Sequence, residues 1–311
     1  MSENIGYESL KGIERQEVLA RVSFPTKREN AIGESSMKSV NRDAIYGWNK
    51  VNLNYDLLGL IPRVKQTVPY KDVVNRVMDS LDKAGLEYKV ISTTVEGAQQ
   101  DMFQKYVFSS SIDNPDGESL SPLMTLRSSY VGSPFSIEFG TYRFICSNGA
   151  MVSHDIVEKY HLNANYSDIF HKVDVGDVIK KRLEQISAVS ERYKELADEE
   201  WIPYFASFIQ NAFVQKGMKT KLFENYAKTN LLSFENNKMS FKNGDLIKLK
   251  LAGHTIYDSE GEPVISFNMS KFRDKSAWDF YNDLTAIATH ETKSESARQT
   301  AYRTISELFV A

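Results

Sequence analysis

The spacing of apolar residues changes along the chain and predicts one helix followed by four strands. Between residues 70 and 84 apolar side chains recur at helical spacing, and Gly85 then supplies a C-cap. Four runs with strand-like alternation follow, at residues 87–95, 101–110, 122–130 and 135–146. The polar links between them are short, which favours an antiparallel meander because parallel strands need longer crossovers.

The linker between the second and third strands contains a turn with a clear local cause. Residues 114–117 read Asn-Pro-Asp-Gly, in which proline presets φ and glycine accepts a positive φ. The chain therefore reverses direction at this position.

Helical spacing returns after the strands. Residues 171–196 predict a long helix, residues 201–214 a second apolar helix, and residues 276–311 a last helical region with Ser276 as its N-cap. Between them, residues 251–268 predict a hairpin around Ser-Glu-Gly-Glu. The fold class expected is α+β, with an antiparallel four-stranded meander packed by a long helix and a helical C-terminal part.

The N-terminal region has few clustered apolar residues. Residues 1–45 are polar and predict an extended or partly ordered arm, while residues 46–62 carry aromatic and leucine anchors. These anchors hold the arm either to the body of the same chain or to a neighbouring subunit. The expected organisation is an arm over 1–62, an α+β core over 63–200 and a mostly helical part over 201–311.

Composition excludes several classes of protein. The 311 residues include 38 basic and 41 acidic side chains, so a net charge of −3 excludes a globally basic nucleic-acid wrapper but permits a local basic face. The apolar fraction of 41% is enough for a sizeable core. No apolar run approaches the roughly 20 residues of a membrane span, and the N-terminal residues lack an apolar signal core. We expect a soluble intracellular protein without a membrane partner.

The sequence carries no signature of an enzyme or of a bound cofactor. A single cysteine, Cys146, rules out an intrachain disulfide and a cysteine-built zinc site, and the five histidines lack metal-ligand spacing. Cys146 acts as a nucleophile only if a base such as His154 or His161 activates it; the simpler interpretation is a small buried side chain in the last strand. Walker A, Rossmann and Gly-x-Ser-x-Gly motifs are missing. We therefore expect no catalytic residue, no metal and no cofactor.

Basic and aromatic residues of the predicted sheet and long helix are the candidates for binding nucleic acid. Arginine and tyrosine on a sheet face suit phosphates and stacked bases, although an ordinary solvated face has the same composition. The candidates are Lys105, Arg127, Tyr130, Tyr142, Arg143, Lys180, Lys181 and Arg182. Asn148 and Gly149 are expected to form a structural turn where the last strand ends. Residues 216–250 add eight lysines against three acidic residues, a local excess of 8 − 3 = +5.

Two segments carry a resemblance to a known family. They are Arg127-Ser-Ser-Tyr-Val-Gly-Ser133 with Gly140-Thr-Tyr-Arg-Phe-Ile-Cys-Ser-Asn-Gly-Ala150, and Trp278-Asp-Phe-Tyr-Asn-Asp-Leu-Thr285. Over about residues 65–300 the chain resembles the phage/plasmid-like protein family of unknown function (domain of unknown function 932). Val131 departs from the acidic residue more usual before Gly132. The order of elements is also similar to the core of single-strand annealing proteins of the RecT and Redβ type.

These resemblances imply a gene of a phage or plasmid, and a protein that acts in the cytoplasm of a bacterial host. Together with the candidate residues they predict a non-enzymatic, homo-oligomeric protein that binds single-stranded DNA during replication or recombination. The alternative is a phage protein that binds a host protein and inhibits or evades a defence complex. The net acidity and the anchor-bearing arm favour that alternative.

Overall fold

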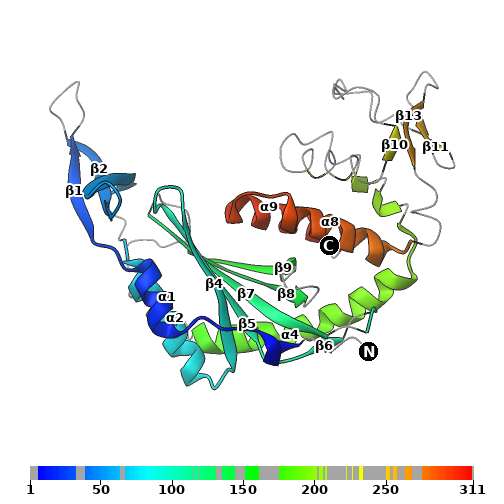
Figure 1. The fold of residues 1–311 in the computed structure, drawn as a ribbon, viewed down its shortest axis with the longest axis horizontal. Coiled ribbons are helices and arrows are strands. Elements are labelled where there is room, and N and C mark those ends of the chain that lie inside the picture. Colours follow the sequence, from blue (N-terminus) through cyan, green and yellow to red (C-terminus); the bar gives the residue numbers. More distant parts are fainter. Residues whose placement is uncertain are drawn as a thin grey trace. The chain divides into compact units, whose positions relative to one another are not determined.

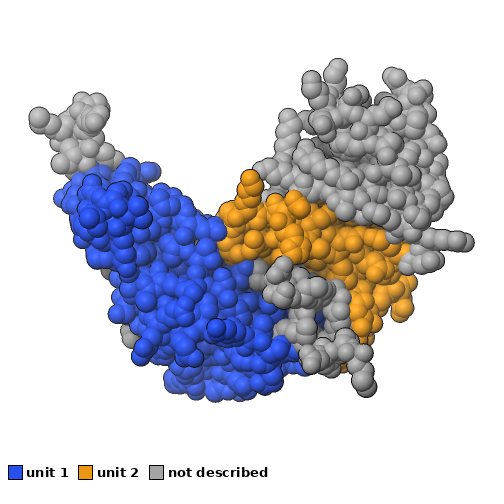
Figure 2. Space-filling model, in the orientation of Figure 1, with its two compact units in different colours: residues 1–112, 119–142, 156–187 blue, residues 113–118, 143–155, 188–311 orange. Residues whose placement is uncertain are grey.

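Two compact units make up the structure, a computed structural model of the chain. Its description covers residues 6–32, 39–63, 67–113, 115–117, 119–130, 135–143, 151–160, 175–201, 203–205, 207–208, 222, 226, 231–233, 250–252, 255–257, 263–267 and 275–309. Figure 1 shows its helices and strands, and Figure 2 colours its two units. Unit 1 comprises residues 1–112, 119–142 and 156–187, and unit 2 comprises residues 113–118, 143–155 and 188–311.

Unit 1 begins with regular structure where the sequence predicted a polar arm. After a short turn of 3₁₀ helix at Tyr7–Ser9, α1 spans Arg15–Val22. An antiparallel sheet in the order β1-β2-β3 follows, with strands at Thr26–Ile32, Ser39–Asn49 and Asn54–Pro62. The sequence pattern missed these strands because they contain many polar and charged residues, since only one face of the sheet is buried.

The first predicted helix is confirmed as α2, Tyr70–Lys83, which packs beside α1 (Figure 1). The apolar residues at helical spacing are buried on one side of it. Gly85 has a φ of 68°, and the N–H of Leu86 donates to the carbonyl of Leu81 at 3.1 Å. The predicted glycine C-cap is therefore present.

The central sheet is antiparallel, as predicted, but it has six strands and not four. The four predicted strands are β4 (Tyr88–Glu96), β5 (Asp101–Phe108), β7 (Ser119–Ser129) and β8 (Phe135–Arg143). To these the structure adds β9 (Met151–Tyr160) beside β8 and the two-residue β6 (Ile112–Asp113), which pairs with β7. The sequence pattern missed β9 because its apolar residues do not alternate regularly, and β6 because it lies inside a polar turn. Gly117 of that turn has a φ of 69°, as the turn requires.

The long predicted helix is α4, Val175–Asp198, which contributes residues to both units. Residues 201, 203–205 and 207–208 are helical, where an apolar helix was predicted over 201–214. Further along, α8 (Ala277–His290) and α9 (Glu295–Phe309) pack on each other (Figure 1). A small antiparallel sheet in the order β10-β13-β12-β11 precedes them, formed by Leu231–Ser233, Pro263–Phe267, Thr255–Tyr257 and Lys250–Ala252. β12 and β13 lie within residues 251–268, where a hairpin was predicted. Among the helices that the structure describes, none combines the length and the apolar character that crossing a membrane requires.

Aromatic side chains form the core of unit 2. Trp278 packs on Tyr193 and Tyr281, with ring centroids 4.8 Å and 5.5 Å away. Its indole Nε1 donates to Asp116 Oδ2 at 2.9 Å. Phe280 contacts a second group of rings that includes Phe205. The helix segment that carries the family resemblance is therefore largely a packing and capping motif.

The predicted N-cap of α8 is confirmed, and it is a complete capping box. Ser276 Oγ accepts from the backbone N–H of Asp279 at 3.2 Å, and Asp279 Oδ2 accepts from the backbone N–H of Ser276 at 2.8 Å. Two N–H groups at the start of the helix are satisfied in this way.

Ser276→Ala should lower the free energy of unfolding by about 1 kcal/mol, because the first turn of α8 loses its hydroxyl acceptor. Urea denaturation followed by circular dichroism measures the change. Ser276→Thr keeps the hydroxyl and is the matched control. A loss that is equal in both variants would contradict a role for the cap.

Candidate interaction surface

Three of the residues predicted to bind nucleic acid are buried in unit 1. Lys105, Tyr130 and Tyr142 are 4%, 3% and 6% exposed, so none of them presents a surface on which a base can stack. The prediction that these residues lie on an exposed face of the sheet is therefore corrected. β5, β7 and β8 are buried on both faces along most of their length, whereas the prediction assumed one open face.

Tyr130 instead packs against α2. Its ring lies 4.2 Å from that of Tyr70, and its hydroxyl accepts from the backbone N–H of Tyr70 at 3.2 Å. Burial raises the pKa of Tyr130 to about 12, so the hydroxyl stays protonated at neutral pH. Tyr130 is therefore a core residue.

Arg127 is half-buried and held within its own sheet. Its Nη2 donates to Asp101 Oδ1 at 3.1 Å, and its guanidinium lies 5.4 Å from the ring centroid of Phe103. Cross-strand pairing places Arg127 opposite Phe103 and Lys105 opposite Thr125, which puts both basic residues on one face of the sheet. The side chains of Arg143 and Cys146, and residues Asn148 and Gly149, lie outside the described residues.

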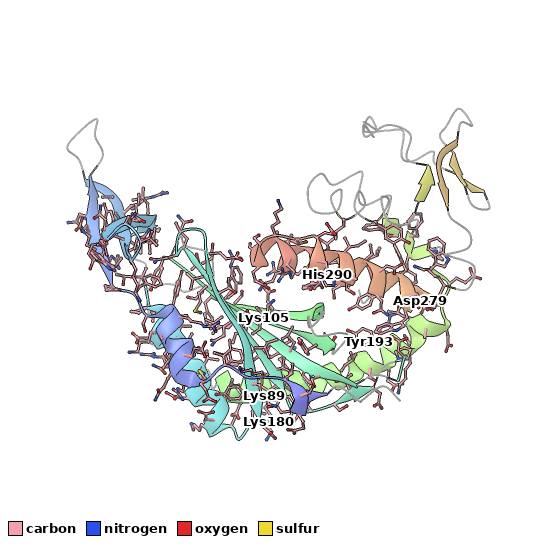
Figure 3. All side chains as sticks on the ribbon, viewed as in Figure 1. Lys89, Lys105, Lys180, Tyr193, Asp279 and His290 are labelled. Carbon is pink, nitrogen blue, oxygen red and sulfur yellow. The ribbon has the colours of Figure 1, made fainter. Side chains whose placement is uncertain are left out.

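The basic residues of α4 are nearer to the solvent. Lys180, labelled in Figure 3, and Lys181 are exposed, and Arg182 is half-buried and donates to Gln185 Oε1 at 2.6 Å. Of the eight candidates, this helix therefore carries the ones that the structure places at the surface. Most of the lysine-rich stretch at 216–250 lies outside the described residues.

An aromatic and apolar surface that the sequence did not predict lies on the β1–β3 sheet. Register places Lys27 opposite Tyr46 and Tyr46 opposite Leu57, and it places Trp48 opposite Tyr55. Because side chains alternate along a strand, one face carries a defined set of residues. We call this set the open face: Lys27, Glu29, Arg42, Ala44, Tyr46, Trp48, Tyr55, Leu57, Leu60 and Pro62.

One end of the open face combines aromatic rings with a cation. Lys27 Nζ lies 5.0 Å from the ring centroid of Tyr46 and 4.9 Å from that of Tyr55, and Trp48 meets Tyr55 edge-on at 5.1 Å. All three rings are partly exposed. Glu29 Oε1 lies 2.8 Å from Lys27 Nζ, and this hydrogen bond raises the pKa of Lys27 above its ordinary value. The lysine is therefore fully charged where the rings reach the solvent.

Exposed aliphatic side chains lie beside these rings, along β3 and on the β2–β3 turn. Leu57 and Leu60 are 51% and 47% exposed, and the turn that leads into β3 exposes Val51 and Leu53 by 93% and 71%. In the part of the chain that the structure describes, these four are all of the exposed large hydrophobic residues. Clustered exposed apolar residues mark interaction sites more often than scattered ones do.

The opposite face of the same sheet is buried. A carboxylate on β2 binds two arginines: Asp43 Oδ2 accepts from Arg28 Nε at 2.6 Å, and Oδ1 accepts from Arg63 Nε at 3.2 Å. Burial disfavours the charged carboxylate, but the two arginines outweigh it and hold the pKa of Asp43 below its ordinary value. The three strands are thereby tied together on the side away from the open face.

Gly47 allows this buried face to approach the β4–β5 turn. A Cβ at this position would lie 2.7 Å from Gln99 Oε1 and 2.9 Å from a methyl carbon of Leu58. Gln99 also donates from Nε2 to the carbonyl of Trp48 at 3.3 Å. The position of the β1–β3 sheet in unit 1 depends on this close contact.

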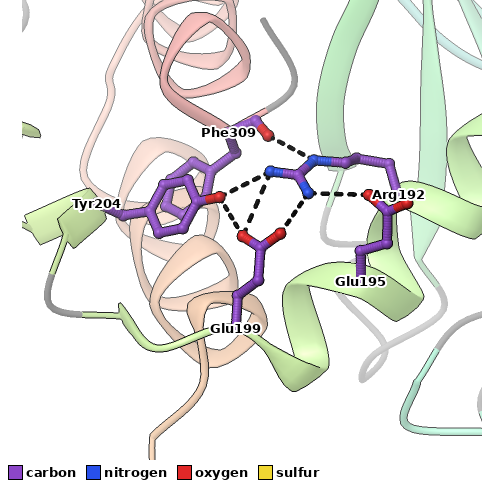
Figure 4. Close-up of polar contacts among 5 residues, drawn as sticks. All are labelled: Arg192, Glu195, Glu199, Tyr204 and Phe309. Carbon is purple, nitrogen blue, oxygen red and sulfur yellow. Dashed lines mark hydrogen bonds and ion pairs between the residues drawn. The ribbon is translucent and has the colours of Figure 1, made fainter.

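A polar cluster in unit 2 surrounds Arg192 (Figure 4). Its Nη1 donates to Glu199 Oε1 at 2.7 Å, its Nη2 to the hydroxyl of Tyr204 at 2.7 Å, and its Nε to the carbonyl of Phe309 at 3.0 Å. The hydroxyl of Tyr204 in turn donates to Glu199. Hydrogen bonds from Arg192 and Tyr204 lower the pKa of Glu199, and burial raises that of Tyr204. A lowered pKa makes Glu199 a weaker base, and a raised pKa makes Tyr204 a poorer nucleophile. The cluster instead holds the end of α9.

Among the residues with described side chains, no group of three or more His, Cys, Asp or Glu is placed to hold a metal ion.

The comparisons with known proteins identify no relative. No family model, curated protein or solved structure matches the chain. Function is therefore inferred from the surfaces of this chain alone.

Asp43→Asn should destabilise the protein near neutral pH, because both arginines lose their shared anion. The folded-state pKa of Asp43 is lower than in the unfolded chain, where it is about 3.9, so the ionised carboxylate stabilises the folded state above that pH. This stabilisation disappears as the pH falls through the folded-state value. Urea midpoints of the two proteins should differ most at pH 7, begin to converge below about pH 4, and meet only as the pH falls through the lower folded-state pKa.

Glu17→Gln is the control, since Glu17 pairs only with Arg21 on the exposed surface of α1. Its effect on the urea midpoint should be small at any pH. A gap between wild type and Asp43→Asn that stays constant from pH 7 to pH 3 would rule out the charge as its cause.

Proposed function

We propose that this chain is a non-enzymatic, phage- or plasmid-encoded protein that binds single-stranded DNA during replication or recombination in a bacterial host. The observation that carries the proposal is the aromatic end of the open face, where the charged Lys27 lies over Tyr46 and Tyr55, and Trp48 meets Tyr55 edge-on. Proteins bind single strands by stacking bases on exposed aromatic rings and by neutralising phosphates with nearby cations.

The sheet geometry supports this mode of binding. Rings on adjacent strands of an antiparallel pair lie about 5 Å apart when they are directly opposite, so a splayed strand meets a continuous aromatic surface. Trp48 and Tyr55 are such a pair, and Tyr46 follows Trp48 on the same face of β2. A base-paired duplex offers no free base faces to these rings, which favours a preference for single strands.

Cations of unit 1 supply the electrostatic part of the proposed binding. Lys27 and Arg42 belong to the open face, and Lys180 and Lys181 are exposed on α4 in the same unit. Each phosphate contact steepens the slope of log affinity against log salt concentration by about 0.7 for a single strand. The resemblance to the phage/plasmid-like family and to annealing proteins of the RecT and Redβ type is consistent with this function.

A second candidate function is binding to a host protein, for example a component of a defence complex. The specific observation in its favour is the tip of the β2–β3 turn, where Val51 and Leu53 are exposed. Apolar residues at such a tip fit a protein partner better than a polyanion. This candidate predicts no appreciable affinity for DNA.

Fluorescence anisotropy of labelled single- and double-stranded oligonucleotides across a salt series tests the proposal. We expect tight binding at low salt, a preference for the single strand, and a steep loss of affinity as salt rises. Trp48→Leu should weaken binding by about 1–3 kcal/mol, or roughly 5- to 150-fold, because one stacking surface is lost. Lys27→Ala should reduce the salt slope by about 0.7.

Lys71→Ala is the matched control for the lysine variant, since Lys71 is exposed on α2, outside the β1–β3 sheet. It should leave both affinity and salt slope unchanged. No binding of wild type at low salt would exclude the DNA-binding proposal and leave the host-protein candidate, which affinity capture from infected cells then tests.

A further inference from the structure

β3 is an edge strand with an unusual composition. In the part of the chain that the structure describes, β3 pairs with β2 on one side and with no strand on the other. An edge strand offers backbone N–H and C=O groups to any further strand, and proteins commonly protect such edges with charges, prolines or bulges. β3 has two of these features, Pro62 and the bulge described below. Here the edge carries Leu57 and Leu60, which are about half exposed.

A bulge sets the spacing of the open-face residues of β3. Ile45 lies opposite Gly59 and Tyr46 opposite Leu57, so Leu58 is the extra residue, and it is fully buried. The residues of β3 on the open face are consequently Tyr55, Leu57, Leu60 and Pro62. These positions are symmetric about the midpoint between Leu58 and Gly59.

This symmetry means that the strand complements itself. In an antiparallel pair of two β3 strands related by a two-fold axis at that midpoint, Leu57 of each copy lies opposite Leu60 of the other. Tyr55 lies opposite Pro62 in the same way, so every open-face residue meets another open-face residue. An interface of this kind uses the same surface on both copies, which is the commonest arrangement in homodimers.

The charges at the two ends of this segment are of opposite sign in this register. Asp56 lies opposite Ile61 of the second copy, and its diagonal neighbour on the same face is Arg63 of that copy, which follows β3 and whose Nε also binds Asp43 of its own chain. Diagonal neighbours are about 7–8 Å apart at their backbones, within reach of a long arginine side chain. The axis produces this opposite-charge pair twice, and no two like charges lie directly opposite each other.

We propose that two copies of this chain associate through β3, antiparallel and in the register that places Leu57 of one copy opposite Leu60 of the other. The two three-stranded sheets then form one continuous sheet. The exposed leucines bury one another on its open face, beside the aromatic rings. This association does not depend on the proposed DNA binding.

Cross-linking between two cysteine variants tests the register. In a Cys146→Ser background, which removes the one native cysteine, Leu57→Cys and Leu60→Cys are purified separately, mixed and oxidised mildly. The mixture should form a covalent dimer several-fold faster than either variant alone, because residues 57 and 60 face each other across the interface. Two copies of residue 57 are separated along the strands by about three residue rises, or roughly 10 Å, which is too far for a disulfide.

Val51→Cys is the matched control, since Val51 is the most exposed of the apolar residues but lies outside the proposed pairing. Its mixture with Leu60→Cys should cross-link no faster than the separate variants do. If the mixture of Leu57→Cys and Leu60→Cys behaves like this control, the register is wrong.

Sedimentation equilibrium without DNA tests the association itself. Wild type should show a reversible monomer–dimer equilibrium. Leu57→Glu/Leu60→Glu should raise its dissociation constant about tenfold or more, because like charges then face each other. Leu57→Lys/Leu60→Glu should restore the dimer, since each lysine faces a glutamate.

Both positions are exposed, so the variants should fold, and circular dichroism verifies this. A wild-type chain that stays monomeric at every concentration overturns the proposal, as do equal constants for the two double variants. A monomer whose DNA binding is intact would separate the two proposals, because it removes the dimer and retains the function. A monomer that captures a host protein through Leu57 and Leu60 would assign this edge to a different partner.

Discussion

A buried contact between two tyrosines holds unit 1 together. The hydroxyl of Tyr70 donates to the backbone carbonyl of Gln100 at 2.5 Å, while its backbone N–H donates to the hydroxyl of Tyr130. The backbone N–H of Tyr130 donates to the same carbonyl at 2.9 Å, and Phe24 packs edge-on against both rings. One small cluster therefore joins the start of α2, the β4–β5 turn, the end of β7 and the segment that leads into β1. Burial of both hydroxyls raises their pKa, so they remain neutral and keep these hydrogen bonds.

The orientation of the β1–β3 sheet follows from this cluster. Phe24 lies two residues before β1, and Gln99 of the β4–β5 turn contacts both Gly47 and the carbonyl of Trp48. One face of the sheet therefore packs against the β4–β5 turn and is buried. Asp43 binds two arginines on this face. The other face keeps its aromatic and aliphatic side chains in the solvent. The surface that we propose to bind DNA, and the edge that we propose to bind a second copy, both result from which face was buried.

The residues that carry the family resemblance have structural roles in this chain. Arg127 binds Asp101, Tyr130 packs on Tyr70, and Asp279 completes the capping box of α8. Trp278 and Tyr281 belong to the aromatic core of unit 2. Such residues specify how the chain folds, and the proposed binding residues lie elsewhere.

Local patterns in the sequence determined most of the individual elements. Periodicity and capping located α2 with its Gly85 C-cap, α8 with its Ser276 N-cap, and four of the six strands of the central sheet. These predictions were correct because a helix or strand that buries one side must repeat its apolar residues at the period of that element. The anchors between residues 46 and 62 were also visible as unusual aromatic and leucine residues.

Tertiary structure decided which of these residues are accessible. Alternation shows that two side chains share a face, but only the packing of a covering layer determines whether that face meets the solvent. Tyr130 and Tyr142 were predicted to be exposed and are buried, because β7 and β8 are covered on both sides. Lys27 and Tyr55 are 28 positions apart in the sequence, and cross-strand register brings them together on the open face. Burial and register depend on contacts between distant segments, and a local pattern does not contain them.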